Sequence, residues 1–141
     1  MIVVAEIGNT TIHIAAFKES QMIEDWCLLT PKKTAIENFE LEFTQFIQSQ
    51  QALFTKPQFE GWILCSVVPW LTTIFREMVR NLIGVIPIAL TRSSPLPIRL
   101  VSGESPTVGI DRLIVAAAAY DLVRGSVITV DIGTATTIDA V

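Results

Sequence analysis

The sequence contains two short stretches of the same design, Glu6-Ile-Gly-Asn-Thr10 and Asp131-Ile-Gly-Thr-Ala135. Each has an acidic residue, then Ile-Gly, then small or hydroxyl-bearing residues, and each lies between two segments rich in β-branched and apolar side chains. A glycine-containing turn between two such segments predicts a β-hairpin. The repeat is short, so two unrelated tight hairpins are the alternative interpretation.

Both turns have the composition of a phosphate site. Glycine lets the backbone approach a phosphate closely and adopt positive φ angles, and the N–H groups of a turn, with Thr and Asn side chains, can point at phosphate oxygens. The acid repels phosphate, but it can hold a cation, usually Mg²⁺ through water, that bridges to the phosphates. Two such hairpins facing each other would clamp a polyphosphate from both sides.

The chain between the turns alternates helices and strands, which predicts the α/β class. Apolar residues recur with the helical period in three segments, and Pro69 and Gly84 are placed to start and to cap the second of these helices. Residues 91–108, rich in Pro and Gly, are expected to form a loop. Helices are predicted at 34–53, 69–83 and 110–123, and strands at 2–5, 12–17, 22–29, 62–68, 85–90, 126–130 and 136–141.

A third motif, Gly109-Ile-Asp111-Arg112, stands at the start of the last predicted helix. A carboxylate in the first turn of a helix is favoured by the helix dipole, so Asp111 is expected to be ionised. It can accept or orient the proton of an alcohol nucleophile, and Arg112 can hold an anionic substrate group. The alternative is an ordinary N-terminal helix acid with a solvated neighbour.

Composition excludes several classes of protein. The chain has 141 residues, of which 50% are hydrophobic and 17% charged, and its net charge is −4. No basic stripe is present to neutralise phosphates, so a nucleic-acid partner is not expected. The N-terminus lacks a signal-peptide pattern, and the apolar runs fall short of the ~20 residues of a membrane helix. Cys27 and Cys65 lack metal-ligand spacing and are expected to be buried free thiols in the cytoplasm.

His13 is the only histidine of the chain. Without a second His or a suitable Cys beside it, a zinc site and a Ser-His-Asp triad are excluded. A half-exposed strand residue is the favoured interpretation, and an approach to phosphates is the alternative. Three tryptophans lie in apolar runs and are expected in the core: Trp26, Trp62 and Trp70.

The three motifs together resemble type III pantothenate kinase, a family of the actin-like superfamily of acetate and sugar kinases. The family pattern of Asp-x-Gly-Asn-Thr, Gly-x-Asp-Arg and Asp-x-Gly-Thr-Ala followed by Thr and Asp is matched in order and spacing at Gly8-Asn9-Thr10, at Gly109-Ile-Asp111-Arg112 and from Asp131 to Asp139. Ser66-Val67-Val68-Pro69 also resembles the family's strand-to-helix junction. The resemblance spans the chain and implies a ribonuclease H-like (actin-like ATPase) fold with a mixed sheet, an N-terminal β-hairpin and flanking helices.

The resemblance also implies a domain division and a reaction. Residues 1–108 would be a first actin-like domain, and residues 109–141 the linking helix and first hairpin of a second. The reaction would be ATP-dependent phosphorylation of pantothenate to 4′-phosphopantothenate, the first step of coenzyme A synthesis.

The resemblance assigns roles to individual residues. Asp111 would be the catalytic proton acceptor, and Asp131 would hold a monovalent cation such as K⁺ or NH₄⁺, in addition to Mg²⁺. Pantothenate would contact Gly109, Ile110, Asp111 and Arg112. ATP would contact Glu6, Ile7, Gly8, Asn9, Thr10, Thr11, Ile12, His13 and Thr134.

Three functional hypotheses follow. The chain is a kinase, or a nucleotide-binding or regulatory module that lost turnover, or an inactive fragment of such a kinase. Position 6 is Glu where the family has Asp, which favours the second hypothesis. Because the exposed strand edges of the second hairpin invite pairing with another chain, we also expect a homodimer, or else an incomplete chain.

Overall fold

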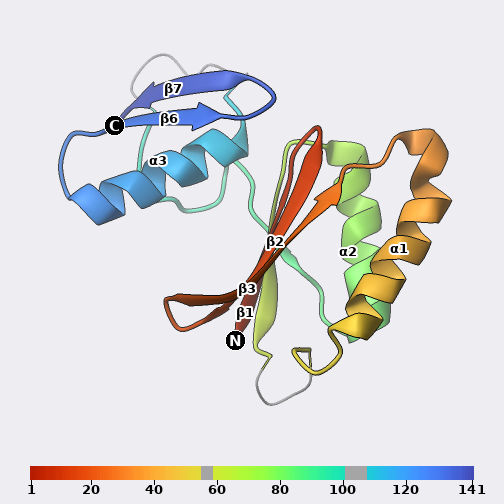
Figure 1. Cartoon of the computed structure of the whole chain (residues 1–141). Coiled ribbons are helices and arrows are strands. Elements are labelled where there is room, and N and C mark those ends of the chain that lie inside the picture. The colour runs from red at the N-terminus through yellow and green to blue at the C-terminus, as the bar shows by residue number, and fades with distance from the viewer. Residues whose placement is uncertain (55–58, 101–107) are drawn as a thin grey trace. The chain divides into compact units, whose positions relative to one another are not determined.

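The computed structural model describes residues 1–54, 59–100 and 108–141 and divides into two compact units, Met1–Ala89 and Leu90–Val141 (Figure 1). The domain division at residues 108 and 109 stays a prediction, because compact units and family domains need not share a boundary. The expected loop is observed over residues 91–100. Its remainder, which contains Gly103 and Pro106, lies outside the described residues.

A five-stranded mixed sheet forms the frame of the first unit, in the order β3-β2-β1-β4-β5. The first three strands are antiparallel neighbours, whereas β4 and β5 run parallel to β1. The expected α/β class, with a mixed sheet that opens on a β-hairpin, is confirmed and is consistent with a ribonuclease H-like fold. The strands are β1 Ile2–Ile7, β2 Thr11–Lys18, β3 Gln21–Leu29, β4 Gly61–Ser66 and β5 Ile88–Ala89.

Two helices, α1 (Ile36–Ser49) and α2 (Pro69–Ile83), cover one face of this sheet (Figure 1). α1 is shorter than the predicted helix 34–53, because a 3₁₀ turn, η1 (Lys33–Ala35), precedes it and Gln50 leaves the helical conformation after it. α2 has the predicted bounds. Gly84 ends it in the left-handed region with φ 78° and donates its N–H to Arg80 O, which confirms the predicted cap.

The core lies between the sheet and these helices. Val3, Ala5 and Ile7 of β1 are buried, and every second residue of β2 faces the same way. At its centre Phe43 of α1 packs against Phe75, with 4.8 Å between ring centroids, and against Trp62. Trp62 is buried as expected, whereas two tryptophans are half-buried at the margin of the core, Trp26 and Trp70.

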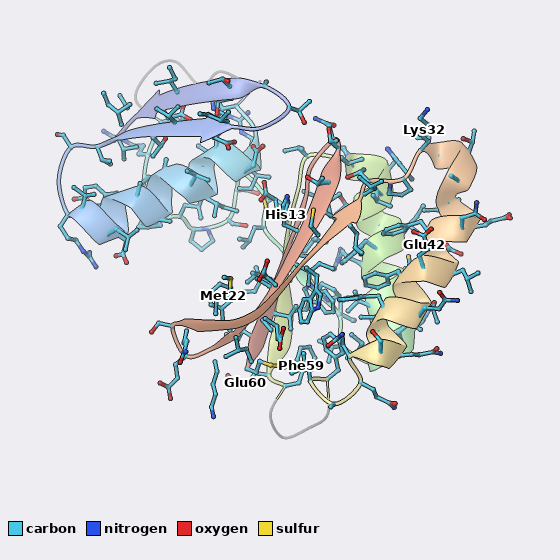
Figure 2. The ribbon with its side chains drawn as sticks, viewed as in Figure 1. His13, Met22, Lys32, Glu42, Phe59 and Glu60 are labelled. Atoms are coloured by element: carbon cyan, nitrogen blue, oxygen red, sulfur yellow. The ribbon has the colours of Figure 1, made fainter. Side chains whose placement is uncertain are left out.

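The opposite face of the sheet carries polar residues near the first turn. Because side chains alternate along a strand, Glu6 and His13, which pair across β1 and β2, both lie on this face. His13 is exposed on β2 (Figure 2). The sheet thus separates an apolar face under α1 and α2 from a face on which functional side chains can meet solvent.

The second unit consists of helix α3 (Ile110–Val123) and an antiparallel hairpin of β6 (Ile128–Ile132) and β7 (Thr136–Ala140). α3 ends at Arg124, which adopts a left-handed φ of 54° and donates its N–H to Tyr120 O. The helix therefore closes one residue before Gly125, the glycine that the sequence places beyond its end. Among the described residues, no helix is long and apolar enough to cross a membrane.

Candidate functional site

The first turn is a tight reversal between β1 and β2. Gly8 N donates a hydrogen bond to Thr11 O over 2.9 Å, and a Cβ atom built on Gly8 would lie 3.2 Å from the same oxygen. Neither Gly8 nor Gly133 has the positive φ that we expected. Close approach of the backbone to Thr11 O, rather than left-handed geometry, therefore favours glycine at position 8.

Neighbouring strands hold this turn in place. The hydroxyl of Thr30, directly after β3, donates to Gly8 O over 2.7 Å, and Thr30 N donates to Thr10 O over 2.9 Å. On the other side, Val67 N donates to Ile7 O over 3.0 Å. The sequence interpretation missed Thr30, because Thr30-Pro31 signals only the end of a strand and the contact spans 22 residues.

In the predicted phosphate-binding stretch 6–13, some side chains face solvent and others face the core. Asn9 and Thr10 at the tip are exposed and Thr11 is half-buried. Ile7 and Ile12 are fully buried in the core. These two residues can therefore reach a ligand only through their backbone, and the polar contacts must come from the tip and from the residues flanking it.

His13 lies between two side chains on the open face of the sheet. Its Nε2 is 3.1 Å from Thr11 Oγ1 and 3.9 Å from the sulfur of Cys27. Cys27 is exposed, so the expectation that both thiols are buried is wrong for it and right for Cys65. The reason is its place on β3, the edge strand, where residue 27 pairs with His13 on the face away from the helices.

The junction from β4 to α2 is built around one serine. Ser66 Oγ accepts hydrogen bonds from Val68 N over 3.1 Å and from Thr72 Oγ1 over 2.7 Å. These bonds fix the chain where β4 turns into α2, and Pro69 occupies the first turn of the helix as predicted. The end of β1 is thereby bonded to a rigid junction through Val67.

The second turn is less closely packed than the first. Gly133 N donates to Ala135 O over 3.2 Å, and a Cβ atom on Gly133 would meet nothing within 4 Å. Asp131, Gly133 and Thr134 are all exposed. No group of three or more His, Cys, Asp or Glu side chains in the described ranges could hold a metal ion.

The start of α3 places the third motif. Gly109 is the N-cap residue in an extended conformation, and Ile110 is buried. Asp111 is half-buried in the first turn, where its Oδ1 accepts a hydrogen bond from Arg112 N over 2.9 Å. This geometry holds the Asp111 carboxylate at the positive end of the helix dipole, which stabilises a negative charge.

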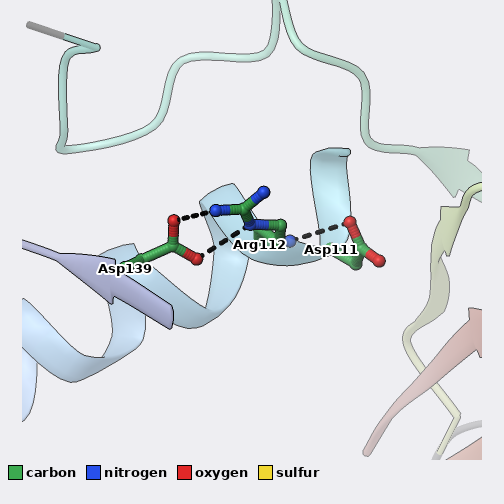
Figure 3. Close-up of polar contacts among 3 residues, drawn as sticks. All are labelled: Asp111, Arg112 and Asp139. Atoms are coloured by element: carbon green, nitrogen blue, oxygen red, sulfur yellow. Dashed lines mark hydrogen bonds and ion pairs between the residues drawn. The ribbon is translucent and has the colours of Figure 1, made fainter. Parts of the chain in front are cut away.

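Arg112 forms a two-point ion pair with Asp139 of β7 (Figure 3). Its Nε donates to Asp139 Oδ2 over 2.9 Å, and its Nη2 donates to Asp139 Oδ1. The sequence interpretation gave Asp139 no role, although it belongs to the matched motif. Two-point Arg–carboxylate contacts fix geometry as well as supplying energy.

The ion pair alters the acid–base properties of both partners. The hydrogen bonds of the pair are the main reason that the pKa of Asp139 lies below its ordinary value. They are also the main reason that the pKa of Arg112 lies above its ordinary value. Partial burial opposes both changes, because desolvation disfavours charge. Both groups are charged at neutral pH.

A hollow of about 600 Å³ adjoins the pair within the second unit. Arg99, Arg112 and Asp139 are among its polar lining residues, and Leu100, Leu113 and Ala116 are among its apolar ones. The second unit thus brings together the predicted substrate-binding segment and the hairpin that bears Asp131. The first turn belongs to the other unit.

Comparison with known proteins finds one family along the chain. The profile of the family described as type III pantothenate kinase matches residues 2–141. The sequence is 33% identical over 144 residues to the type III pantothenate kinase of Moorella thermoacetica, covering 100% of this chain and 55% of that protein. Identity to the protein of the same name from Citrifermentans bemidjiense is 28% over 141 residues, with the same coverage. The chain therefore spans about half the length of the curated relatives it matches.

Solved structures give a more distant likeness. The structure described as a structural study of the Aquifex aeolicus PPX-GPPA enzyme aligns with 99% of this chain and 51% of that chain. The TM-score is 0.47 and the sequence identity 15%.

Proposed function

The chain belongs to the type III pantothenate kinase family, and we propose that it carries part or all of the machinery for ATP-dependent phosphorylation of pantothenate to 4′-phosphopantothenate, the first step of coenzyme A synthesis. The observation that carries the proposal is the family match over residues 2–141, which includes all three motifs. The proposal is supported by the exposed polar tip of the first turn, by the place of Asp111 in the first turn of α3 and by the exposed carboxylate of Asp131.

Asp111 is the proposed proton acceptor. Its Oδ1 accepts a hydrogen bond from Arg112 N, and the carboxylate lies in the first turn of α3. As the primary hydroxyl of pantothenate attacks the terminal phosphorus of ATP, the new O–P bond forms, the bond to ADP breaks, and the hydroxyl proton passes to the Asp111 carboxylate. Gly109, Ile110 and Arg112 complete the proposed substrate-binding segment.

The phosphates of ATP are assigned to the first turn and to Thr134. Exposed Asn9 and Thr10 offer polar groups at a tip whose backbone is fixed by Thr30. Mg²⁺ is usually bound through one or two carboxylates plus substrate phosphates, and the single exposed carboxylate of Asp131 suits such a site or the proposed K⁺ or NH₄⁺ site. A bound cation would neutralise charge on the phosphates; the protein residues orient them.

We further propose that the chain forms a homodimer and acts in the cytoplasm. Four apolar residues on the outer face of the β6–β7 hairpin are more than half exposed, and within the described residues both strands of this two-stranded sheet have an unpaired edge. Exposed apolar strands of this kind favour pairing with another chain. Light scattering tests the association: a monodisperse monomer would rule out the dimer. The four residues are Ile128, Val130, Ile132 and Ile138.

The function is tested by measuring 4′-phosphopantothenate formation with the wild-type chain and Asp111→Ala. Loss of a positioned proton acceptor is expected to lower kcat by about 10²–10⁴-fold. Asp121→Asn is the control, because Asp121 is an exposed α3 carboxylate paired with Arg124. Wild-type turnover that Asp111→Ala leaves unchanged would remove Asp111 from the mechanism.

Calorimetric titration with ATP and Mg²⁺ separates the two other hypotheses. Heat of binding without turnover would identify a nucleotide-binding module that lost catalysis. Absence of both turnover and binding would leave an inactive fragment.

A further inference from the structure

The geometry of the second unit points to Asp139 as a positioning residue. We propose that Asp139 fixes the plane of the Arg112 guanidinium, so that the edge of this group that Asp139 does not occupy is presented to the carboxylate of an organic acid. The inference rests on the proposed function, in which Arg112 belongs to the pantothenate-binding segment. It assigns to β7 a role in substrate recognition.

The donor geometry of arginine supports this role. A guanidinium has five N–H donors in a rigid plane, and Asp139 takes one from Nε and one from Nη2. In Figure 3 the third nitrogen, Nη1, lies on the side turned away from Asp139. The edge formed by Nη1 and Nη2 therefore still has two parallel N–H groups, the arrangement that matches a second carboxylate.

Fixing the side chain is what makes this edge useful. An arginine on a helix surface has many accessible rotamers, and ordering it upon binding costs free energy. At Arg112 the two-point contact sets the orientation before a ligand arrives. The side chains of Arg112 and Asp139 are 32% and 24% exposed, so the pair is shielded enough to persist and open enough to be reached.

The surroundings indicate the chemical class of the ligand. The hollow beside the pair is large enough for a small organic molecule. Its remaining walls include a second cation, Arg99, and the apolar side chains of Leu100, Leu113 and Ala116. An acid with an apolar body would place its carboxylate on Arg112 and its body against these side chains. Pantothenate has this character, as the proposed function requires.

The pair also joins two motifs. Asp139 is 27 residues from Arg112 in the sequence, and it lies on the same face of the hairpin as Asp131, because Thr129 pairs with Asp139 and Asp131 with Thr137. Fixing Arg112 therefore also fixes the hairpin that bears Asp131 relative to the helix that bears Asp111.

A purely electrostatic role and a positioning role of Asp139 predict opposite effects on anion binding when its charge is removed. The negative charge of Asp139 offsets the positive charge of Arg112, so removing it would strengthen the attraction of an anion. If orientation matters more, removing it weakens anion binding. The variant Asp139→Asn distinguishes the two, because it abolishes the charge and the two-acceptor geometry while keeping the size of the side chain.

The experiment measures the affinity of the whole chain for two ligands, pantothenate and panthenol, in which an alcohol replaces the carboxylate. The wild type is expected to bind pantothenate more tightly. Asp139→Asn should weaken pantothenate binding roughly tenfold, the range of one hydrogen bond to a charged group, and leave panthenol binding unchanged. Asp139→Glu should recover part of the loss, and Asp121→Asn should lose nothing.

A second measurement follows the Nε–Hε signal of Arg112 by nuclear magnetic resonance. In the wild type and in Asp121→Asn this signal should be sharp and protected from exchange with water, and in Asp139→Asn it should be lost while the backbone amide spectrum stays folded. Persistence of the protected signal in Asp139→Asn would show that other groups orient Arg112, and would overturn the inference.

The binding results separate this inference from the proposed function. Pantothenate binding that is unchanged or tighter in Asp139→Asn would overturn the positioning role while leaving the proposed function intact. A wild-type chain that binds neither ligand would contradict the proposed function and, with it, the assignment of the ligand. In that case the Nε–Hε signal still decides whether Asp139 fixes Arg112.

Discussion

The two acid–Ile–Gly turns share a sequence design and differ in structural support. In the first turn Ile7 is fully buried, Gly8 closes a hydrogen bond to Thr11, and Thr30 binds the turn from a third strand. In the second turn the corresponding Ile132 is 81% exposed and no described atom lies within 4 Å of where a Cβ on Gly133 would stand. One motif is part of a core, and the other projects from a two-stranded hairpin.

The difference shows that a local motif specifies a hairpin but not its rigidity. β1 lies in the middle of a five-stranded sheet, between β2 and β4. Within the described residues the β6–β7 hairpin pairs with no third strand, and a two-stranded hairpin is marginally stable by itself in water. Its contacts with α3 include the Arg112–Asp139 ion pair.

The largest effect is expected from replacing the isoleucine that precedes the glycine in each turn. Ile7→Ala removes a side chain with no exposed surface and is expected to lower the free energy of unfolding of the first unit by roughly 2–5 kcal/mol. Ile132→Ala should change the stability of the second unit by less than about 0.5 kcal/mol. Urea unfolding checks both, followed by tryptophan fluorescence for the first unit, which contains every tryptophan, and by amide resonances of α3 for the second.

Equal losses of unfolding free energy in Ile7→Ala and Ile132→Ala would mean that the side chain of Ile132 is buried in solution. Together with a dimer in light scattering, that result would place Ile132 in the interface between copies of the chain.

Much of the fold follows from sequence because it depends on local patterns. The bounds of α2 were predicted from one apolar stripe, Pro69 and Gly84, and all three act within the helix itself. α1 was predicted too long, because its apolar periodicity continues past Gln50, where the backbone leaves the helix. Helix ends are set by backbone hydrogen bonds that a hydrophobic pattern does not encode.

The contacts that shape the candidate site are non-local and were not predictable in the same way. Thr30 reaches Gly8 across 22 residues, and Asp139 reaches Arg112 across 27. The sequence marks Asp139 and Arg112 as members of motifs, but only the packing of β7 on α3 shows that they pair. The exposure of Cys27 likewise depends on β3 being the edge strand, which the sequence of β3 alone does not show.

The next test replaces the glycine of each turn, one at a time, with alanine. In Gly8→Ala the new Cβ meets Thr11 O at 3.2 Å, and the turn must open to relieve the contact. We expect the first unit to lose about 1–2 kcal/mol of stability. Gly133→Ala meets nothing and should be neutral or slightly stabilising, because alanine restricts the unfolded chain. The same unfolding measurements apply, and a larger loss in Gly133→Ala would contradict the comparison.

A smaller effect is expected at Thr30. Thr30→Val keeps the shape of the side chain but removes the hydroxyl that binds Gly8 O, at a cost of about 1 kcal/mol. The matched control is Thr44→Val, which removes an exposed hydroxyl that binds Glu40 O within α1. If the first turn binds ATP, Thr30→Val should also weaken ATP binding in calorimetry while Thr44→Val does not. An equal effect of both variants on ATP binding would show that Thr30 does not support the site.

The smallest effect concerns the pH dependence of the second unit. The pKa of Asp139 in the folded chain lies below its ordinary value because Arg112 donates hydrogen bonds to it. The folded state therefore binds the proton more weakly than the unfolded state does. Stabilisation by the pair is then complete above the unfolded pKa of about 3.9, and it is lost as the pH falls through the lower folded pKa.

Asp139→Asn should accordingly be less stable than the wild type at pH 7, by roughly 0.5–1 kcal/mol for a partly exposed pair. The difference should vanish in strong acid, where the wild-type carboxylate is protonated as well. Amide resonances of α3 during urea unfolding at several pH values measure this difference, with Asp121→Asn as the control for a more exposed pair. A pH-independent difference would mean that the asparagine disturbs packing rather than charge, and the hairpin would then be held to α3 by its apolar contacts alone.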